Sequence, residues 1–268
     1  MKVSIITAVL NGAKTIEYCI QSVLMQTYPH IEHIIIDGGS TDGTVEIIKK
    51  YEDKIAYWVS EPDNGYYDAI NKGIKAACGD IIGILNSDDF YANDKVIEKV
   101  VDVFRKNNVD SCYGDLQYVD KRDPDKVIRY WKSSPYRNGL FKKGWMIPHP
   151  TFFVKRKVYE KYGLFNSDLK IAADYELMLR FLEKNKISTY YIPEVLVKMR
   201  LGGASNRSVL NLIRKSYEDY LVLRMHNIGG LLTLFRKNLS KISQFFKKTV
   251  KERGHMVLVL GLTLFNFV

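Results

Sequence analysis

The chain of 268 residues is 46% hydrophobic and 26% charged, a balance that supports a substantial core and excludes an intrinsically disordered protein. Its cysteines, Cys19, Cys78 and Cys112, match no zinc or redox spacing, and their odd number argues against a disulfide framework, so we expect a reducing compartment. The net charge of +10 is uneven, because residues 209–268 hold ten Lys or Arg against three Asp or Glu. This basic tail favours an anionic partner, either a membrane surface or nucleic acid.

Apolar runs and amphipathic stretches alternate over residues 1–108. We expect strands at residues 3–9, 31–36, 55–59 and 81–85. The first lacks the charged start and cleavage site of a signal peptide. Helices are predicted after each strand, around residues 16–24, up to residue 51, at 67–77 and around 96–104. Four strand–helix repeats predict a Rossmann-like α/β fold, with a mostly parallel sheet covered by helices on both faces.

Polar side chains follow three of these strands, at the point where each strand ends. Asn11 follows the first strand, Asp37 ends the second, and Asp88 and Asp89 follow the fourth. Because the carboxyl ends of parallel strands share one edge, these side chains are predicted to converge on one cleft. The alternative for Asp88 and Asp89 is an Asx turn without a ligand.

The first turn lacks the Gly-x-Gly-x-x-Gly pattern of dinucleotide-binding proteins, and the chain contains no Gly-x-x-x-x-Gly-Lys-Ser/Thr motif. Phosphate binding by a glycine loop alone is therefore disfavoured. A divalent metal that joins carboxylates to a diphosphate is the better explanation of the paired acids.

The pattern changes after residue 108. We expect a hairpin from residues 111–119 and 127–131, a strand at 151–154, a helix at 157–162, a helix that opens near residue 171, and short strands at 189–192 and 195–199. A loop with two glycines, Gly202 and Gly203, follows.

Four motifs in order carry a family resemblance. They are Val3-Ser4-Ile5-Ile6-Thr7 with Asn11, Ile35-Ile36-Asp37-Gly38-Gly39-Ser40-Thr41-Asp42-Gly43-Thr44, Asn71-Lys72-Gly73 and Asn86-Ser87-Asp88-Asp89. Residues 1–205 resemble the family-2 glycosyltransferases of the GT-A fold. The resemblance implies a GT-A domain over residues 1–208, with a nucleotide-binding half at 1–108 and an acceptor-binding half at 109–208. The segment Glu61-Pro62-Asp63-Asn64-Gly65-Tyr66-Tyr67-Asp68-Ala69 is similar to enzymes that assemble bacterial surface polysaccharides.

The resemblance also implies roles for individual residues, with a UDP-sugar as the expected donor. Asp37 would accept a hydrogen bond from the uracil base, Asp88 would contact the ribose, and Asp89 would hold Mn²⁺ or Mg²⁺ on the diphosphate. Further contacts with the nucleotide are expected from Thr7, Asn11, Asp63 and Asn71. Many relatives carry Arg where this chain has Ile70, so any contact of that Arg is replaced or lost.

Sugar transfer requires a base that deprotonates the acceptor hydroxyl, and a carboxylate can do this. The resemblance implies that Asp174, at a helix start, is this base. The usual acidic neighbour is replaced by Ala173, and Glu176 would face elsewhere on the helix. The alternative for Asp174 is an acid that only stabilises the helix N-terminus.

Three further residues have two interpretations each. His149 would contact the acceptor or the diphosphate, or pack in the interior. Arg200 would clamp the diphosphate from a mobile loop, or lie on the surface. Trp145 would stack on a sugar, or pack in the core.

Residues 209–268 are predicted to form a helical tail. Apolar residues form a stripe flanked by basic ones, and residues 256–268 are almost entirely apolar but too short to span a bilayer. We expect a basic amphipathic anchor at the membrane surface. The alternative is that the stripe packs on the catalytic domain.

These features predict an inverting, metal-dependent glycosyltransferase that moves a sugar from a UDP-sugar to a lipid-linked or polysaccharide hydroxyl. It would act in bacterial surface polysaccharide biosynthesis, in the cytoplasm and on the inner face of the cell membrane. The alternative is a non-catalytic module that binds nucleotide or nucleic acid through the basic tail. Nucleic acid is not the expected partner, because Phe235, Phe245 and Phe246 join the apolar stripe instead of lying among the basic residues.

Overall fold

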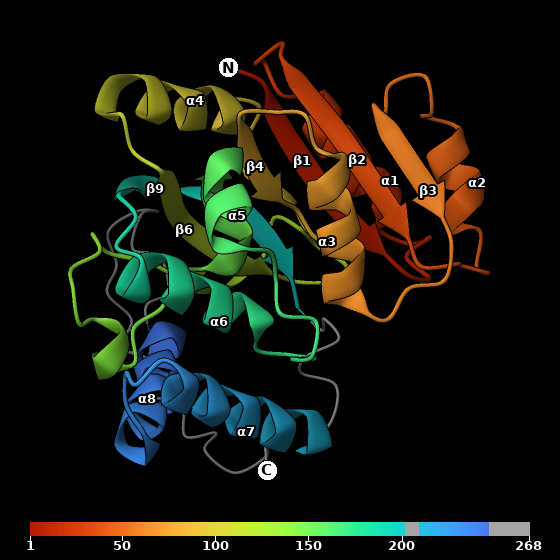
Figure 1. Ribbon diagram of the computed structural model, residues 1–268. Coiled ribbons are helices and arrows are strands. Elements are labelled where there is room, and N and C mark those ends of the chain that lie inside the picture. The colour runs from red at the N-terminus through yellow and green to blue at the C-terminus, as the bar shows by residue number, and fades with distance from the viewer. Residues whose placement is uncertain (202–208, 247–268) are drawn as a thin grey trace, which may run out of the picture.

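The computed structural model describes residues 1–201 and 209–246 (Figure 1). Its strands are β1 (Val3–Val9), β2 (Ile31–Asp37), β3 (Tyr57–Ser60), β4 (Ile81–Ile84), β5 (Phe90–Tyr91), β6 (Ser111–Val119), β7 (Val127–Trp131), β8 (Phe153–Lys155) and β9 (Thr189–Arg200). Its α-helices are α1 (Ile16–Leu24), α2 (Thr44–Lys49), α3 (Tyr66–Ala76), α4 (Val96–Asn107), α5 (Arg156–Tyr162), α6 (Ala173–Met178), α7 (Val209–Met225) and α8 (Leu231–Phe246). Short 3₁₀ turns lie at Phe141–Lys143 (η1) and His149–Thr151 (η2), and the π-helix η3 (Leu179–Lys184) continues α6.

The strands form one sheet in the order β3-β2-β1-β4-β8-β6-β9-β5, with β7 paired to β6. The strands β3, β2, β1 and β4 all run parallel to one another, as the alternating pattern predicts. Antiparallel pairs enter in the second half, where β8 joins β4 to β6. The parallel register places Val9 beside Asp37, so the loops after β1 and β2 leave the sheet at the same edge.

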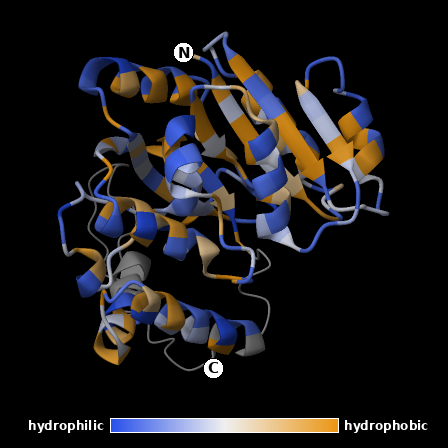
Figure 2. Ribbon diagram, viewed as in Figure 1, coloured by the Kyte–Doolittle hydropathy of each residue, from blue (hydrophilic) through white to orange (hydrophobic). Residues whose placement is uncertain are grey.

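Hydrophobic side chains pack on both faces of this sheet, and successive residues of a strand face opposite sides. Ile6 and Ile34 point into a cluster with α3, α5 and α6. Ile5 and Ile35 point into a second cluster with α1, α2 and α4. Figure 2 shows β1 and β2 mostly in hydrophobic colours, as expected for strands covered on both faces. The prediction of helices on both faces is confirmed.

Helix α3 lies unusually close to β1. A Cβ atom added at Gly73 would come within 2.4 Å of the Ile6 side chain. The glycine of the Asn71-Lys72-Gly73 motif therefore has a packing role, because any larger residue would push α3 away from the sheet. This close contact holds the first turn of α3 beside the carboxyl edge of the strands.

Some elements differ from the prediction. The two short strands expected at 189–192 and 195–199 form the single strand β9, whose pairing with β6 is interrupted by a register shift near Asp115. The two-residue strand β5 was not predicted, since its length is below what periodicity can detect. Helices α7 and α8 lie together at the end of the molecule opposite the N-terminus (Figure 1).

Candidate active site

The loops after β1 and β2 are joined by side chain to backbone hydrogen bonds. Asn11 has a left-handed backbone with φ of 52°, which asparagine tolerates better than most residues. Its backbone N–H donates to Ser40 Oγ at 2.7 Å, and its side-chain oxygen accepts from the N–H of Thr41 at 2.9 Å. Asn11 therefore remains at the exposed edge of the sheet while it fixes the position of the second loop.

Asp37 is fully buried and organises the same loop. Its carboxylate accepts hydrogen bonds from the backbone N–H of Gly39 and Ser40, from the Ser40 hydroxyl and from the Ser60 hydroxyl, at 2.5–3.1 Å. The side chain of Asp63 lies next to this loop, because a Cβ added at Gly38 would meet Asp63 Oδ2 at 2.5 Å. Because Gly38 and Gly39 have no side chains, the segment of Asp63 can lie against the loop of Asp37.

Thr7 lies beneath this edge and does not face it. Its side chain is fully buried and its hydroxyl is 3.0 Å from Nε2 of His33 on β2. Burial lowers the pKa of His33 to about 3, so the imidazole is neutral at physiological pH. In this arrangement the Thr7 side chain supports the sheet edge and is not open to a ligand.

Asp88 and Asp89 lie at the end of β4, where the strand register brings them next to the β1 loop. Asp88 is partly exposed, whereas Asp89 is fully buried. Asp89 Oδ2 accepts a hydrogen bond from the side-chain amide of Asn86 at 2.7 Å. Burial, and then the negative charge of Asp88, raise the pKa of Asp89 well above its ordinary value. The motif thus holds a buried acid beside a second acid.

Arg200 is the last residue of β9 and contacts both Asp88 and Asp89. Its backbone N–H donates to Asp89 Oδ1 at 3.3 Å, and its guanidinium donates to the carbonyl of Asp88 at 3.0 Å. The guanidinium carbon lies 4.6 Å from the ring centre of Tyr18 and 4.8 Å from that of Phe90. At 7% exposure, Arg200 is a buried strand residue and not the surface arginine of the alternative interpretation. The predicted hinge glycines, Gly202 and Gly203, lie outside the described residues.

Asp174 comes from the second half, at the start of α6. Its carboxylate accepts a hydrogen bond from the N–H of Tyr175 at 2.7 Å. Desolvation raises the pKa of the Tyr66 hydroxyl, and the charges of Asp174, Asp89 and Asp88 raise this pKa further. Tyr66 therefore lies within electrostatic reach of acids from both halves of the chain.

His149 lies near the same group of acids. Its ring is half-buried and meets the ring of Phe165 edge-on, with centroids 5.7 Å apart. Burial lowers the pKa of His149, and the charge of Asp174 acts in the opposite direction. The half-buried imidazole is therefore packed against Phe165, and its burial disfavours the charged form.

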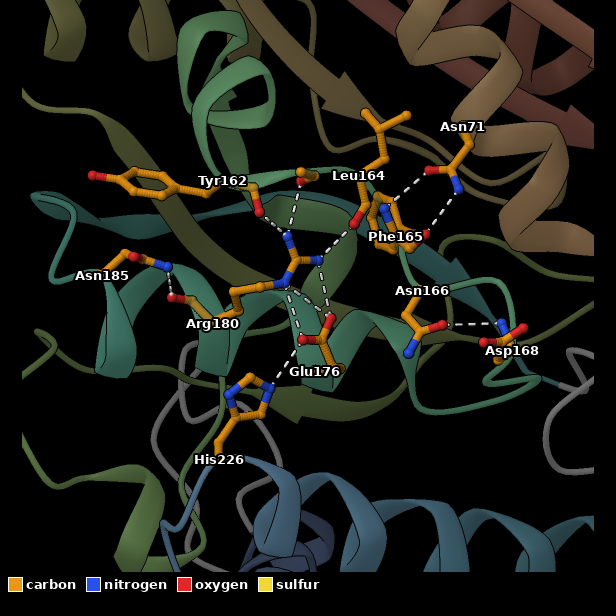
Figure 3. Close-up of polar contacts among 11 residues, drawn as sticks. Asn71, Tyr162, Leu164, Phe165, Asn166, Asp168, Glu176, Arg180, Asn185 and His226 are labelled. Carbon is orange, nitrogen blue, oxygen red and sulfur yellow. Dashed lines mark hydrogen bonds and ion pairs between the residues drawn. The ribbon is translucent and has the colours of Figure 1, made fainter.

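Asn71 joins α3 to the loop that precedes α6. Its amide donates to the carbonyl of Phe165 at 2.9 Å and accepts from the Phe165 N–H at 3.0 Å (Figure 3). Both polar atoms of the side chain are thus engaged with the backbone of one residue. In this structure Asn71 holds the two halves of the chain together. Ile70, the residue before it, is fully buried.

Glu176 faces away from the acid group, as predicted, and forms a separate network. Figure 3 shows its carboxylate between Arg180 and His226, with the closest oxygens 3.0 Å from Arg180 Nε and 2.9 Å from His226 Nε2. Arg180 also donates to the carbonyls of Tyr162 and Leu164. This network fixes α6, and with it Asp174, against α7 and the loop after α5.

Trp145 packs among aromatic residues. Its ring centre lies 5.5–6.0 Å from those of Tyr113, Tyr136 and Phe141. Of its two interpretations, Trp145 therefore follows the one in which it packs in the core.

The acids fit a hard divalent cation. Asp88 and Asp89 supply carboxylate oxygens, and the unfavourable burial of the Asp89 charge is what a cation would relieve. Among the described residues no group of three or more His, Cys, Asp or Glu could enclose a metal. A cation here would therefore take its remaining ligands from water and from substrate phosphates, which is the usual arrangement for Mg²⁺ with one or two carboxylates.

Two contributors to the site were quoted within sequence motifs but given no role. Tyr66 and Tyr67 contact the acid loop and the loop before Asp174, respectively. Glu218 of α7 accepts hydrogen bonds from the N–H groups of Ile171 and Ala172 at 2.8 and 3.0 Å. No periodicity signals such contacts, because they depend on how distant segments meet.

Comparison with known proteins gives a consistent result. The family model of glycosyl transferase family 2 matches residues 4–163. An uncharacterized glycosyltransferase of Rickettsia typhi is 33% identical over 281 residues, which cover 97% of this chain and 84% of the relative.

Two solved structures share the fold. S. aureus TarS 1-349 in complex with UDP-GlcNAc has a TM-score of 0.65 and 18% identity, over 84% of this chain and 65% of that one. The mannosyltransferase PcManGT of Pyrobaculum calidifontis, in complex with GDP-Man and Mn2+, has a TM-score of 0.62 and 18% identity, over 93% and 76% of the two chains. This likeness shows the GT-A fold, in agreement with the prediction.

Proposed function

The chain belongs to glycosyl transferase family 2, and we propose that it is an inverting enzyme that transfers a sugar from a UDP-sugar to a hydroxyl group. The observation that carries this proposal is that the start of α3 contacts both halves of the chain. The Tyr66 hydroxyl donates to Asn86, in the loop of Asp88 and Asp89, and the Tyr67 hydroxyl donates to the carbonyl of Ile171, three residues before Asp174. A glycosyltransferase needs residues that bind the donor close to a base that deprotonates the acceptor hydroxyl.

For the donor, we propose that the loops around Asn11, Asp37 and Asp63 bind the nucleotide. Thr7 and Asn71 would act indirectly, because their side chains support the sheet edge and α3. The partly exposed Asp88 would contact the ribose. A UDP-GlcNAc complex among the structural neighbours supports a UDP-sugar, while a GDP-Man complex makes GDP-sugars the comparison of choice.

For the diphosphate, Asp89 and Arg200 are the proposed contacts. Asp89, with its raised pKa, would hold Mn²⁺ or Mg²⁺, and the guanidinium of Arg200 lies against the same loop. A bound cation would act as a Lewis acid that stabilises the departing diphosphate. The Mn2+ complex of PcManGT supports a metal of this kind.

For the acceptor, we propose Asp174 as general base, with His149 beside it. The carboxylate of Asp174 would take the proton of the acceptor hydroxyl as its oxygen bonds to the anomeric carbon of the sugar. The bond between that carbon and the diphosphate oxygen breaks on the opposite face, and UDP leaves with the bonding electrons. A single displacement of this kind inverts the anomeric configuration.

A donor screen tests this proposal. The full chain would be titrated with UDP-GlcNAc, UDP-glucose, UDP-galactose and GDP-mannose, with Mn²⁺ or with chelator, while its melting temperature is recorded. Binding of a ligand to the folded state alone raises the melting temperature. We expect a rise with at least one UDP-sugar that requires Mn²⁺. Stabilisation by GDP-mannose alone would replace the UDP assignment, and no stabilisation by any of the four would contradict the proposed donor class.

The acceptor is proposed to be a lipid-linked or polysaccharide hydroxyl in bacterial surface polysaccharide biosynthesis, reached from the cytoplasmic face of the membrane. Helices α7 and α8 support a membrane contact, because large apolar side chains on both are exposed. On α7 they recur every four residues and so share one face, at Ile213, Tyr217, Leu221 and Met225. On α8 they are Leu231, Leu232, Phe235 and Leu239. No helix of the described residues is long and apolar enough to cross a bilayer.

The side of α8 that faces the domain carries a buried lysine as well as Leu234, which packs against the core. Lys237 is 1% exposed, and its Nζ atom lies 2.6 Å from Asp219 of α7 and 3.3 Å from the ring centre of Tyr175. The helix is thus attached to the domain through its lysine, while Leu231 and Phe235 are 72% and 61% exposed. Packing on the domain and an outward apolar face therefore occur together in α8. An apolar face flanked by basic residues suits an anionic bilayer.

Co-sedimentation of the full chain with vesicles tests this contact. We expect binding to vesicles that contain phosphatidylglycerol, and weaker binding to vesicles of phosphatidylcholine alone. The double variant Leu231→Ser/Phe235→Ser should lose most of this binding, whereas Asn238→Ser, also exposed on α8, should retain it. Unchanged binding by the double variant, or salt-dependent binding to nucleic acid in place of vesicles, would contradict the membrane assignment.

A further inference from the structure

Two adjacent tyrosines begin α3, and their hydroxyl groups reach different halves of the chain. The Tyr66 hydroxyl donates to Asn86 Oδ1 at 2.6 Å, in the loop of the paired acids. The Tyr67 hydroxyl donates to the carbonyl of Ile171 at 2.7 Å, three residues before Asp174. The two rings meet edge-on, with centroids 5.1 Å apart. One helical turn thus contacts both the acid loop and the loop that carries the candidate base.

The contact of Tyr66 continues to Asp89. Because Asn86 Oδ1 accepts the proton of the Tyr66 hydroxyl, the amide nitrogen of Asn86 faces the other way. That nitrogen donates to Asp89 Oδ2 at 2.7 Å. The relay from Tyr66 through Asn86 therefore orients the carboxylate that would bind the metal. Outer groups of this kind, which hydrogen bond to a metal ligand, fix its direction and its affinity for the metal.

The contact of Tyr67 is part of a wider attachment of α3 to residues 165–171. Its ring is 7% exposed and stacks on Phe165 at a centroid distance of 5.6 Å and an interplanar angle of 16°. Asn71, one turn further along α3, holds the backbone N–H and C=O of Phe165 by two hydrogen bonds. Glu218 holds the N–H groups of the same segment from α7. The start of α6, and hence Asp174, is therefore positioned from α3.

We propose that Tyr66 and Tyr67 together set the position of Asp89 relative to Asp174. Tyr66 is a positioning residue for the metal and the diphosphate, and Tyr67 is a positioning residue for the base. This inference rests on the proposed transferase function. It divides two neighbouring, chemically identical side chains between two different steps, donor binding and proton transfer.

The test uses Tyr66→Phe and Tyr67→Phe in the full chain, with Tyr57→Phe as a control on the exposed face of β3. Each change removes one oxygen atom and keeps the ring. UDP binding would be measured by calorimetry with and without Mn²⁺. The rate constant kcat and the donor KM would be measured for hydrolysis of a UDP-sugar, with water as the acceptor.

Tyr66→Phe is expected to weaken Mn²⁺-dependent UDP binding by about tenfold or more, with little change in binding without metal. Tyr67→Phe is expected to leave UDP affinity unchanged and to lower kcat by about tenfold, with an unchanged donor KM. Asn86→Ala should reproduce the loss seen in Tyr66→Phe, and the double variant should be no worse than Asn86→Ala alone, because both residues act through one relay.

Three results would overturn this inference while leaving the proposed function intact. They are wild-type behaviour of either tyrosine variant, an equal loss of binding and kcat in both, or full additivity of Tyr66→Phe with Asn86→Ala. A wild-type chain that binds no UDP with Mn²⁺ would instead contradict the proposed function itself, and the inference with it.

Discussion

The backbone N–H of Arg200 donates a hydrogen bond to Oδ1 of Asp89, although the two residues are 111 positions apart. This contact joins the last residue of β9 to the loop after β4, and so links the second half of the chain to the acid pair of the first. With the amide of Asn86 on the other oxygen, it leaves the Asp89 carboxylate held on both sides. A buried acid fixed in this way is suited to bind a cation that arrives with its substrate.

Replacement of Asp89 by Asn tests its role as a metal ligand. Asn keeps the shape of the side chain but removes the charge that a divalent cation needs. We expect Mn²⁺-dependent UDP affinity to fall by more than about 100-fold, beyond the range usual for outer groups around a metal. Asp94→Asn, on the exposed segment after β5, is the matched control and should bind as wild type does. Equal losses in both variants would point to a general charge effect.

The same substitution is expected to stabilise the ligand-free protein. The pKa of Asp89 is raised in the folded state, so the folded chain binds more protons than the unfolded chain above the ordinary Asp pKa. The free energy of unfolding therefore falls as pH rises from the ordinary Asp pKa to the raised pKa of Asp89. Asn does not titrate, so the variant does not lose this stability. The melting temperature of Asp89→Asn without metal should exceed that of wild type at neutral pH, and the difference should shrink towards about pH 4. A lower melting temperature at neutral pH would contradict the burial of a charged Asp89.

Asp174→Asn tests the base. The amide cannot accept the proton of the acceptor, and loss of a general base typically lowers kcat by about 10²- to 10⁴-fold. UDP binding with Mn²⁺ should not change, because the proposed role of Asp174 is on the acceptor and not on the donor. Asp168→Asn, an exposed acid in the loop before α6, serves as the control. Full activity of Asp174→Asn would exclude the assignment.

The Glu176 network is expected to matter for folding. Glu176→Ala would leave Arg180 and His226 without their shared carboxylate in a buried environment. Removal of one partner of a buried ion pair typically costs about 3–5 kcal/mol of the free energy of unfolding. Glu160→Ala breaks an exposed pair with Arg156 and should cost less than about 1 kcal/mol. Urea denaturation of both variants would show the contrast, and similar small costs would argue that α6 does not depend on the network.

The sequence predicts the first half of the fold well, because buried parallel strands such as β1 and β2 are continuous apolar runs and their order limits the topology. It also predicts that Asn11, Asp37 and Asp89 lie at one edge, since parallel strands end together. It does not predict the direction of the side chains. Thr7 shares this edge in the sequence, but it faces His33 inside the protein.

Contacts between distant segments are also beyond the sequence pattern. Lys237 is expected from periodicity on a solvated basic face, but it is buried against Asp219, because a pattern within one helix contains no information about its neighbour. The roles of Tyr66 and Tyr67 depend in the same way on loops 20 and 104 residues away in the chain.

The most direct test of the central claim is the release of UDP from a UDP-sugar by the full chain, measured with Mn²⁺ and with chelator. We expect release that requires Mn²⁺ and that is abolished in both Asp89→Asn and Asp174→Asn, while only the second variant still binds UDP. Metal-independent release, or release that persists in both variants, would show that these acids do not form the active site.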